Sequence, residues 1–431
     1  MQFVQKLLLT ASIGGAAACG AAELPRAGSP EDVGLSSARL RRVTDTFNAD
    51  VEADKIAGAV VIIVRDGKVA YHEAFGFRDR SKSAPMSRDA IFRIASMTKP
   101  VTAVAALMLM EEGKLQLIDP ASKYLPELKG LKVGVETTGE GGQPTLRLEP
   151  MRREITIQDL LRHTSGLTYG PFGDSLVQRA YRAANTMDDQ QTNAEMMQKL
   201  ARLPLAYQPG TMFEYGMSTD VVGRVVEVQA EQDLERFFAE RITKPLGMTD
   251  TAFRLTSVQA ERLAEPQPLV KGGPVIVAGY NPARPATWFS GGGGLLSTAM
   301  DYARFCQMLL NDGELDGVRL LSRKSVQLMR SNHLPPEVGY GSFTQELGMT
   351  APLPALGQGY GLGVGVRLEQ GRSTVPGSVG DHFWGGATGP YYWIDPQEKL
   401  VAVMMLQELD TQRRTHYRSL LRNLVYQALA P

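Results

Sequence analysis

Apolar and β-branched residues gather in short runs near both ends of the chain. At residues 59–64 and 68–71 two such runs flank Asp66-Gly67, a dipeptide that favours the tight turn of a β-hairpin. Asp395-Pro396 predicts another turn far along the chain, between two more such runs. In all, the C-terminal part holds three runs that predict strands, at residues 359–368, 391–394 and 400–406.

Helical patterns lie outside these runs. Leu35 opens a pattern that continues to about Ala53, with Ser36 as its expected N-cap, and residues 411–429 predict a terminal helix. Residues 101–110 are apolar on nearly every side, which predicts a helix buried within the protein.

Strands at both ends around a mostly helical middle predict one α/β domain of the α+β type. Its α/β part is expected from about residues 35–98 and 346–431, and a mostly helical part is inserted at about 99–345. The segment 136–150 is polar and aperiodic, so we expect a surface loop there.

The N-terminus has the layout of a secretory signal at residues 1–19: one basic residue, a short apolar run, then small residues. Ala16-Ala17-Ala18-Cys19 is compatible with cleavage after a small residue or with lipid attachment at Cys19; an uncleaved tail is the third alternative. We expect an exported protein, periplasmic or secreted, that contacts a membrane only through such an anchor. Residues 20–34 are expected to be a linker.

Charge and composition exclude several functions. Lys plus Arg and Asp plus Glu both total 46, so no basic excess favours nucleic acid as a partner. The 2 Cys and 5 His fall in no zinc-binding spacing. We therefore expect neither a metal nor an organic cofactor.

Ser96-Met-Thr-Lys99 stands directly before the apolar helix and is the one Ser-x-x-Lys in the chain. Pro100 is tolerated in a first helical turn, and Gly113 ends the helix. Ser96 is thus placed at a helix N-terminus, where free N–H groups stabilise an oxyanion, with Lys99 on the same side. A buried lysine is costly unless paired or functional. The alternative is an N-cap serine beside a surface lysine.

Taken together with four later segments, this motif resembles the class C β-lactamase-like serine hydrolases, and most closely the bacterial family VIII carboxylesterases. The similarity covers about residues 35–430 and implies an antiparallel sheet flanked by helices, a helical domain, and an active site between them. The later segments lie at residues 159–167, 209–220, 291–297 and 382–387.

Carried over by motif, the resemblance makes Ser96 the acylated nucleophile, Lys99 its activating partner and Tyr215 a proton relay. A tyrosine that merely packs at a helix start is the alternative for Tyr215. Met217 stands where the family's motif has Asn.

Trp384-Gly385-Gly386 replaces the family's Lys-Thr-Gly, so a cation suited to a substrate carboxylate is absent from that motif. We expect Trp384 and Met217 to offer apolar contact surface to neutral esters, and the N–H of Ala387 to join that of Ser96 as the oxyanion hole. A strand bend packed by Trp384 is the alternative.

His163 and His382 lack an assignable acidic partner in the sequence and are interpreted as structural. The function predicted is a serine carboxylesterase for small, short-chain esters that acts through an acyl-enzyme. A β-lactamase or D-alanyl-D-alanine peptidase-like enzyme is the first alternative, and a non-catalytic penicillin- or peptidoglycan-binding module the second. Acyl transfer to an alcohol also stays open.

Overall fold

The computed structural model describes residues 23–269, 273 and 280–430. The expected signal segment and Cys19 lie outside these residues. Residues 23–34, the described part of the segment expected to be a linker, pack against the protein: Leu24 and Val33 are buried and Arg26 forms a β-bridge with Val69.

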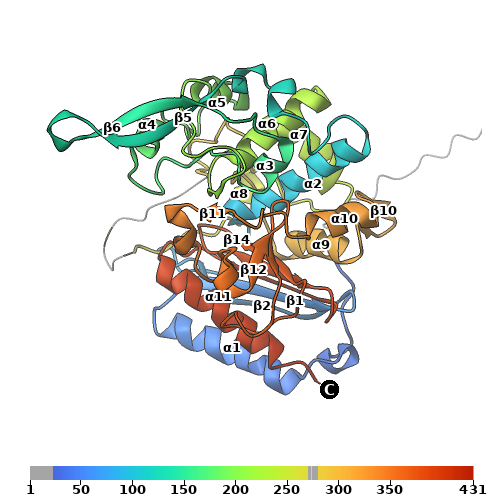
Figure 1. Cartoon of the computed structure of the whole chain (residues 1–431). Coiled ribbons are helices and arrows are strands. Elements are labelled where there is room, and N and C mark those ends of the chain that lie inside the picture. The colour runs from blue at the N-terminus through green and yellow to red at the C-terminus, as the bar shows by residue number, and fades with distance from the viewer. Residues whose placement is uncertain (1–22, 270–272, 274–279, 431) are drawn as a thin grey trace, which may run out of the picture.

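An antiparallel sheet joins the two ends of the chain, as the fold-class prediction requires (Figure 1). The N-terminal and C-terminal strands meet where β1 (Gly58–Arg65) pairs with β16 (Leu400–Leu406), and Ala59 lies opposite Leu406. The predicted hairpin at Asp66-Gly67 joins β1 to β2. The strands follow one another in the order β12 (Gln358–Tyr360), β13 (Gly365–Arg367), β14 (His382–Gly385), β15 (Tyr391–Asp395), β16 (Leu400–Leu406), β1 (Gly58–Arg65), β2 (Lys68–Asp79) and β3 (Ala84–Pro85).

Each face of the sheet has its own core. On one face α1 (Ser37–Glu52), capped by Ser36 as expected, and α11 (Thr411–Tyr426) cover Val61, Ile63 and their neighbours (Figure 1). On the other face the alternate residues, such as Ile62, belong to the larger core that includes the helical region. Because successive side chains of a strand point to opposite faces of the sheet, neighbouring residues of β1 pack into different cores.

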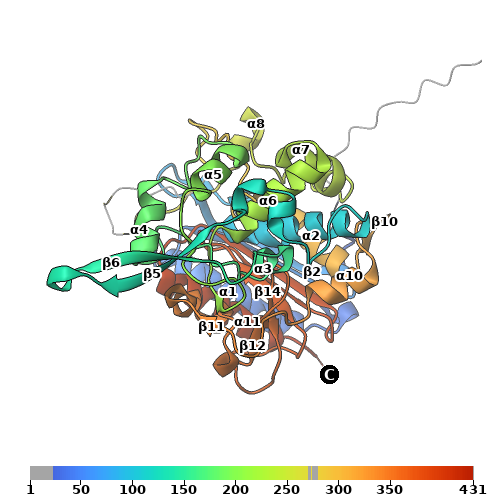
Figure 2. The ribbon, with the colours of Figure 1, turned by 45° about the horizontal axis from the view of Figure 1, so that its top comes forward.

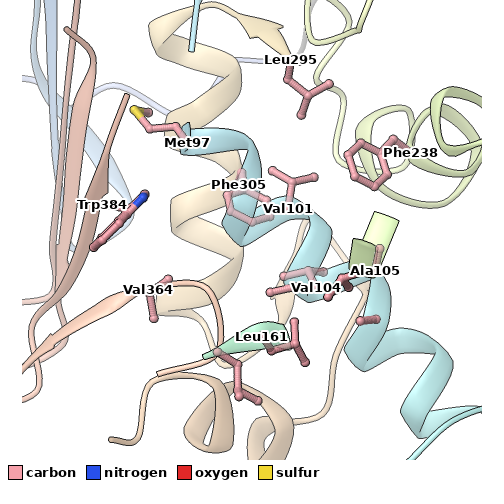
Figure 3. Close-up of a cluster of buried hydrophobic side chains, with 14 of the residues drawn as sticks. Met97, Val101, Val104, Ala105, Leu161, Phe238, Leu295, Phe305, Val364 and Trp384 are labelled. Atoms are coloured by element: carbon pink, nitrogen blue, oxygen red, sulfur yellow. The ribbon is translucent and has the colours of Figure 1, made fainter. Parts of the chain in front are cut away.

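The helical region is built around α2 (Thr98–Glu111), which is buried nearly throughout, as its all-round apolar pattern predicts. Figure 3 shows Val101 and Val104 of α2 close to Phe305 of α9, with Met97 and Trp384 on the side of the sheet. The other helices of this region are α3 (Ile157–Leu161), α4 (Leu176–Ala183), α5 (Asn193–Leu200), α6 (Ser218–Ala230), α7 (Leu234–Phe238), α8 (Ser257–Ala260), α9 (Ala299–Leu310) and α10 (Arg323–Met329).

Two local expectations were wrong. The segment expected to be a surface loop forms a hairpin of β5 (Lys132–Thr138) and β6 (Pro144–Pro150), which extends away from the helices in Figures 1 and 2. Val133 and Val135 alternate with other residues in β5, and Leu146 and Leu148 do so in β6, but the register places Glu149 and Arg147 opposite the two valines. The apolar positions of the two strands therefore lie on opposite faces of the hairpin, and the short alternation within each strand was hidden by Thr, Glu and Gly.

The run at 359–368 is not one strand but two, β12 and β13, joined by a turn in which the Gly361 N–H donates to the Val364 carbonyl at 2.8 Å. Gly363 has a φ of 81°, a conformation that favours glycine. This turn lies against the start of α2, because a Cβ on Gly363 would be 3.2 Å from the Lys99 carbonyl oxygen.

Small paired strands complete the fold. Two of these pairs border the site described below: β4 (Phe92–Arg93) with β8 (Leu296–Ser297), and β7 (Met212–Phe213) with β11 (Gly339–Tyr340). A third pair, β9 (Glu314–Leu315) with β10 (Val318–Arg319), follows α9.

Candidate active site

Ser96 stands at a sharp turn between β4 and α2. The residue before it, Ala95, has a φ of 44°, which is uncommon for a residue with a side chain and stores backbone strain. Residues Ala95–Met97 form a single 3₁₀ turn that leads into α2, with Pro100 in the first turn as predicted. The Ser96 side chain is half-buried, so the strained turn presents its hydroxyl at the start of a buried helix.

Lys99 is fully buried beside Ser96. Its Nζ lies 3.2 Å from Ser96 Oγ, 3.3 Å from Tyr169 Oη and 2.7 Å from the Gly292 carbonyl oxygen. An ammonium group has three donors, and these three oxygens match them. The alternative of a surface lysine does not fit this burial.

Tyr169 and Asp220 extend this cluster, and sequence reasoning missed both. Tyr169 Oη donates to Asp220 Oδ2 at 3.2 Å, and burial followed by the charge of Asp220 raises the pKa of Tyr169 well above its ordinary value. Asp220 also accepts hydrogen bonds from the Ser290 hydroxyl and the Gly292 N–H. Burial raises the pKa of Asp220, against the opposing effect of Lys99. Asp220 ends the segment 209–220 used for the resemblance, and Tyr169 follows the segment 159–167 by two residues, so their positions were the available signal.

Tyr215 lies on the other side of Lys99. The Lys99 Nζ is 4.6 Å from the centroid of the Tyr215 ring, and the Trp384 Nε1 donates to Tyr215 Oη at 3.3 Å. The rings of Tyr215 and Tyr169 approach edge to face at 5.9 Å. Lys99 therefore has a tyrosine on each side, one bound through its hydroxyl and the other through its ring face.

Trp384 and Met217 do not offer the apolar contact surface expected of them. Trp384 is 1% exposed and Met217 is 0% exposed, because both side chains belong to the core. The expectation was wrong because the register of β14 places Trp384 opposite Tyr392 and turns its side chain into the core. Its indole N–H instead holds the Tyr215 hydroxyl.

The segment after Trp384 comes close to the Ser96 turn. A Cβ on Gly386 would lie only 2.4 Å from the Ile94 carbonyl oxygen, so glycine is required for this approach. The Thr388 hydroxyl donates to the Arg93 carbonyl at 2.6 Å and fastens the segment to β4. Ala387 between them is exposed, and its N–H has no acceptor within the described residues. A second oxyanion donor beside Ser96 is thus sterically available.

A cavity of about 520 Å³ opens over Ser96. Ala387 and Thr388 form one side of it. Its cations already have partners: Arg93 pairs with Glu265 at 3.0 Å, and Arg284 with Asp189 at 2.6 Å. Aromatic and sulfur-containing side chains supply much of the remaining wall, namely Phe172, Met187, Phe253, Tyr280 and Trp288.

The two histidines contact other groups than Ser96. The His163 ring packs on Tyr215 at 4.8 Å, and its Nε2 lies 3.4 Å from the Thr219 hydroxyl. His382 Nδ1 lies 3.3 Å from the Gly380 carbonyl oxygen. Burial lowers the pKa of both imidazoles, that of His382 to about 4. These contacts agree with a structural interpretation.

Over the part of the chain that the structure describes, no group of three His, Cys, Asp or Glu side chains is arranged to hold a metal ion. Within the same residues, no helix has the length and apolar character needed to cross a membrane.

A serine within hydrogen-bond distance of a buried lysine, flanked by tyrosines and facing a cavity, is the arrangement expected of serine hydrolases of the Ser–Lys kind. The beta-lactamase family profile matches residues 43–427, and the chain belongs to this family.

Three similar proteins indicate the branch of the family. The chain is 38% identical to protein Rv1367c of Mycobacterium tuberculosis over 86% of this chain and 89% of that one. It is 29% identical to esterase EstB of Burkholderia gladioli over 85% and 90%. Among solved structures, EstCE1, described as a hydrolase with promiscuous acyltransferase activity, has a TM-score of 0.73 and 27% identity over 90% of this chain and 99% of that one. Serine hydrolase activity of the esterase kind is therefore supported in general.

Proposed function

We propose that this protein is a serine carboxylesterase that hydrolyses small, neutral, short-chain esters through an acyl-enzyme on Ser96. The observation that carries the proposal is the contact of the buried Lys99 Nζ with Ser96 Oγ at 3.2 Å, beneath a cavity with no unpaired cation on its described walls.

In the acylation step, the Ser96 oxygen attacks the ester carbonyl and its proton passes to the Lys99–Tyr215 pair, which enters the step with one of its two groups deprotonated, the lysine amine or the tyrosine hydroxyl. The carbonyl oxygen becomes an oxyanion, held by the N–H groups of Ser96 and Ala387. When the tetrahedral intermediate collapses, the carbon–oxygen bond to the alcohol breaks and the stored proton goes to the leaving alkoxide. Water then repeats the sequence on the acyl-enzyme and releases the acid.

Tyr169 and Asp220 support this chemistry by fixing Lys99. Because the Lys99 Nζ is bound by Tyr169 Oη and the Gly292 carbonyl as well as by Ser96, its position does not depend on the substrate. Such preorganisation lowers the cost of reaching the transition state.

Neutral substrates are favoured by the ion pairs of the cavity wall. A carboxylate such as that of a β-lactam would have to displace Glu265 or Asp189 to gain a guanidinium partner. A charge-assisted hydrogen bond is worth about 1.5–3 kcal/mol. We therefore expect β-lactams to be turned over about ten to a hundred times less efficiently than p-nitrophenyl butyrate.

A second candidate is transfer of the acyl group to an alcohol in place of water. The similarity to EstCE1, described as having promiscuous acyltransferase activity, favours it, and the cavity of about 520 Å³ has room for an acceptor. Product analysis with added alcohols separates transfer from hydrolysis.

The decisive test is Ser96→Ala. We expect its hydrolysis of p-nitrophenyl butyrate to fall by several orders of magnitude, and a fluorophosphonate to add its mass to the Ser96 peptide of the unmodified protein but not of the variant. Retained activity would contradict the proposal. A cephalosporin kcat/KM equal to that of p-nitrophenyl butyrate would favour the β-lactamase alternative.

Export, expected from residues 1–19, completes the proposal. Fractionation of cells that express the full chain tests it, and Cys19→Ala distinguishes lipid attachment from simple cleavage. Recovery of the unprocessed chain in the cytoplasm would contradict export.

A further inference from the structure

Arg418 of α11 is a buried cation that no carboxylate in the described parts of the chain neutralises. It is 7% exposed, and burial, followed by the charge of Arg414, lowers its pKa to about 10, so it stays charged at neutral pH. On the same helix, Arg422 pairs with Asp381 at 2.7 Å and Arg413 with Glu408 at 2.9 Å. An unpaired buried charge is costly, so its contacts are informative.

The charge of Arg418 is directed at one peptide group. Its Nη2 donates to the Gly386 carbonyl at 2.6 Å, and more weakly to the Pro390 carbonyl at 3.4 Å. The carbonyl of Gly386 and the N–H of Ala387 belong to the same planar peptide unit. The Arg418 cation therefore lies at the carbonyl end of this peptide dipole. The other end is the Ala387 N–H, which is proposed to bind the oxyanion.

The neighbouring glycine makes this contact possible. A Cβ on Gly385 would lie 2.7 Å from the Arg418 Cζ, so the guanidinium occupies the place of a Gly385 side chain. Gly385 therefore leaves room for the Arg418 guanidinium beside the strand, which is a different role from letting a ligand approach the backbone.

We propose that Arg418 is a positioning residue that holds and polarises the Gly386–Ala387 peptide, and thereby strengthens the Ala387 N–H as an oxyanion donor. The inference rests on the proposed function, since it presupposes that an oxyanion forms beside Ser96. A cationic donor on the carbonyl draws electron density from the peptide nitrogen, and hydrogen bonds in such a chain reinforce one another. The effect is greatest in the transition state, when the carbonyl oxygen of the ester carries its charge.

Direct binding of a substrate by Arg418 is disfavoured by its location. Trp384 faces the core of the helical region, whereas α11 covers the opposite face of the sheet. The cavity wall contains Ala387 and Thr388, and the backbone of this segment separates Arg418 from the cavity. Arg418 acts through the peptide and not on the substrate.

The test compares Arg418→Gln with Arg414→Gln, a matched control one turn away on the same helix, whose guanidinium donates to the Leu409 carbonyl at 2.7 Å. For Arg418→Gln we expect kcat for p-nitrophenyl butyrate to fall about tenfold with KM nearly unchanged; loss of a whole oxyanion donor costs about 10²–10³-fold. Affinity for a trifluoromethyl ketone, which forms an oxyanion on the serine, should fall by the same factor, and affinity for the parent methyl ketone should not. Arg414→Gln should leave all these values unchanged.

A folded Arg418→Gln with undiminished trifluoromethyl ketone affinity would overturn the inference, and so would equal losses for both ketones, which indicate a merely structural role. If Arg418→Gln does not fold, Arg418→Lys is measured in its place. Lysine keeps the positive charge but has a shorter side chain. We therefore expect kcat and the affinity for the trifluoromethyl ketone to fall by the same factor, and by less than in Arg418→Gln. A loss in kcat without a loss in that affinity overturns the inference. Fluorophosphonate labelling of Ser96 in these variants separates this failure from failure of the proposed function, which would leave Ser96 unlabelled.

Discussion

Two buried ionic clusters lie on opposite faces of the one sheet, and they differ in what they can do. On the helical side, Lys99 is bound to Ser96, Tyr169 and the Gly292 carbonyl, beside a cavity. On the side of α11, Asp381 Oδ2 accepts from the Arg367 Nε at 3.0 Å and from the Arg422 Nη1 at 2.7 Å.

The second cluster, around Asp381, is enclosed by aromatic side chains. The Arg422 guanidinium lies over the rings of Phe383 and Trp393 at 5.2 and 4.9 Å, and its Nε donates to the Tyr391 hydroxyl. Burial lowers the pKa of Arg422, but the charge of Asp381 raises it more, so the guanidinium keeps its proton. Lysine and tyrosine can pass protons at accessible pH, whereas arginine cannot. Burial and charge alone therefore do not define a reactive site; exchangeable protons, a nucleophile and access do.

Replacing Lys99 should give the largest effect on activity. In Lys99→Met the Ser96 hydroxyl loses its activating partner, so we expect kcat/KM for p-nitrophenyl butyrate to fall at least about 10³–10⁴-fold. The melting temperature should change little, because the variant also removes a buried charge. Activity assays and thermal unfolding on the same preparation check both expectations; a stable variant with more than a tenth of the activity would contradict them.

Replacing Asp381 should lower the stability of the protein and leave its activity unchanged. In Asp381→Asn two buried guanidiniums lose their counter-charge, which should lower the free energy of unfolding by about 3–5 kcal/mol. Below its melting temperature the folded variant should keep its kcat, since neither arginine contacts the cavity. Urea titration with active-site counting by a fluorophosphonate measures the two separately. A loss of kcat per labelled site would show that the clusters are coupled.

The two tyrosines beside Lys99 offer a finer comparison. Tyr215→Phe removes the proposed proton relay and should reduce kcat about 10²–10³-fold. Tyr169→Phe removes only one of three ligands of the Lys99 ammonium, so we expect a smaller loss together with a shifted pH profile. His163→Asn and His382→Asn serve as controls that should act through stability or binding. A histidine variant as inactive as Ser96→Ala would replace this mechanism with a Ser–His one.

The smallest effect concerns Glu214, a buried carboxyl that has no cationic partner among the described residues and accepts from the Thr168 hydroxyl at 2.6 Å. Burial raises the pKa of Glu214 to about 7 from 4.5. A carboxyl whose pKa is raised on folding contributes stability below its unfolded pKa, and this contribution is lost as the pH rises through the folded pKa. Between pH 4.5 and 7 the unfolding free energy of the unmodified protein should fall by up to about 3 kcal/mol through this group. Glu214→Gln should flatten that fall in urea titrations across the range, and an unchanged slope would contradict the assignment.

Much of the fold could be predicted from the sequence, wherever a single hydrophobic pattern dominates a segment. The α+β fold, the hairpin at Asp66-Gly67 and the buried helix after Ser96 follow from alternation and from all-round apolarity. The hairpin β5–β6 was missed because polar side chains outnumber the alternating apolar ones on its exposed strands.

The site was predictable only in part, for a different reason. Ser96 and Lys99 are neighbours on one helical turn, so their spacing brings them together. Tyr169 and Asp220 reach Lys99 from distant segments, and the inward direction of Trp384 depends on strand register. Arg418 reaches Gly386 from α11, 32 residues further along the chain, and nothing local in the sequence encodes that contact.

The pairing of β1 with β16 has a consequence for how the molecule assembles. Ala59 cannot meet Leu406 until nearly the whole chain has been synthesised, so the two parts of the sheet are joined by a contact across most of the sequence. Contacts of such separation make folding slow and leave apolar strands exposed in the meantime. The nascent chain should consequently stay unfolded while it leaves the ribosome, a state suited to passage through a narrow translocation channel and dependent on chaperones for protection from aggregation.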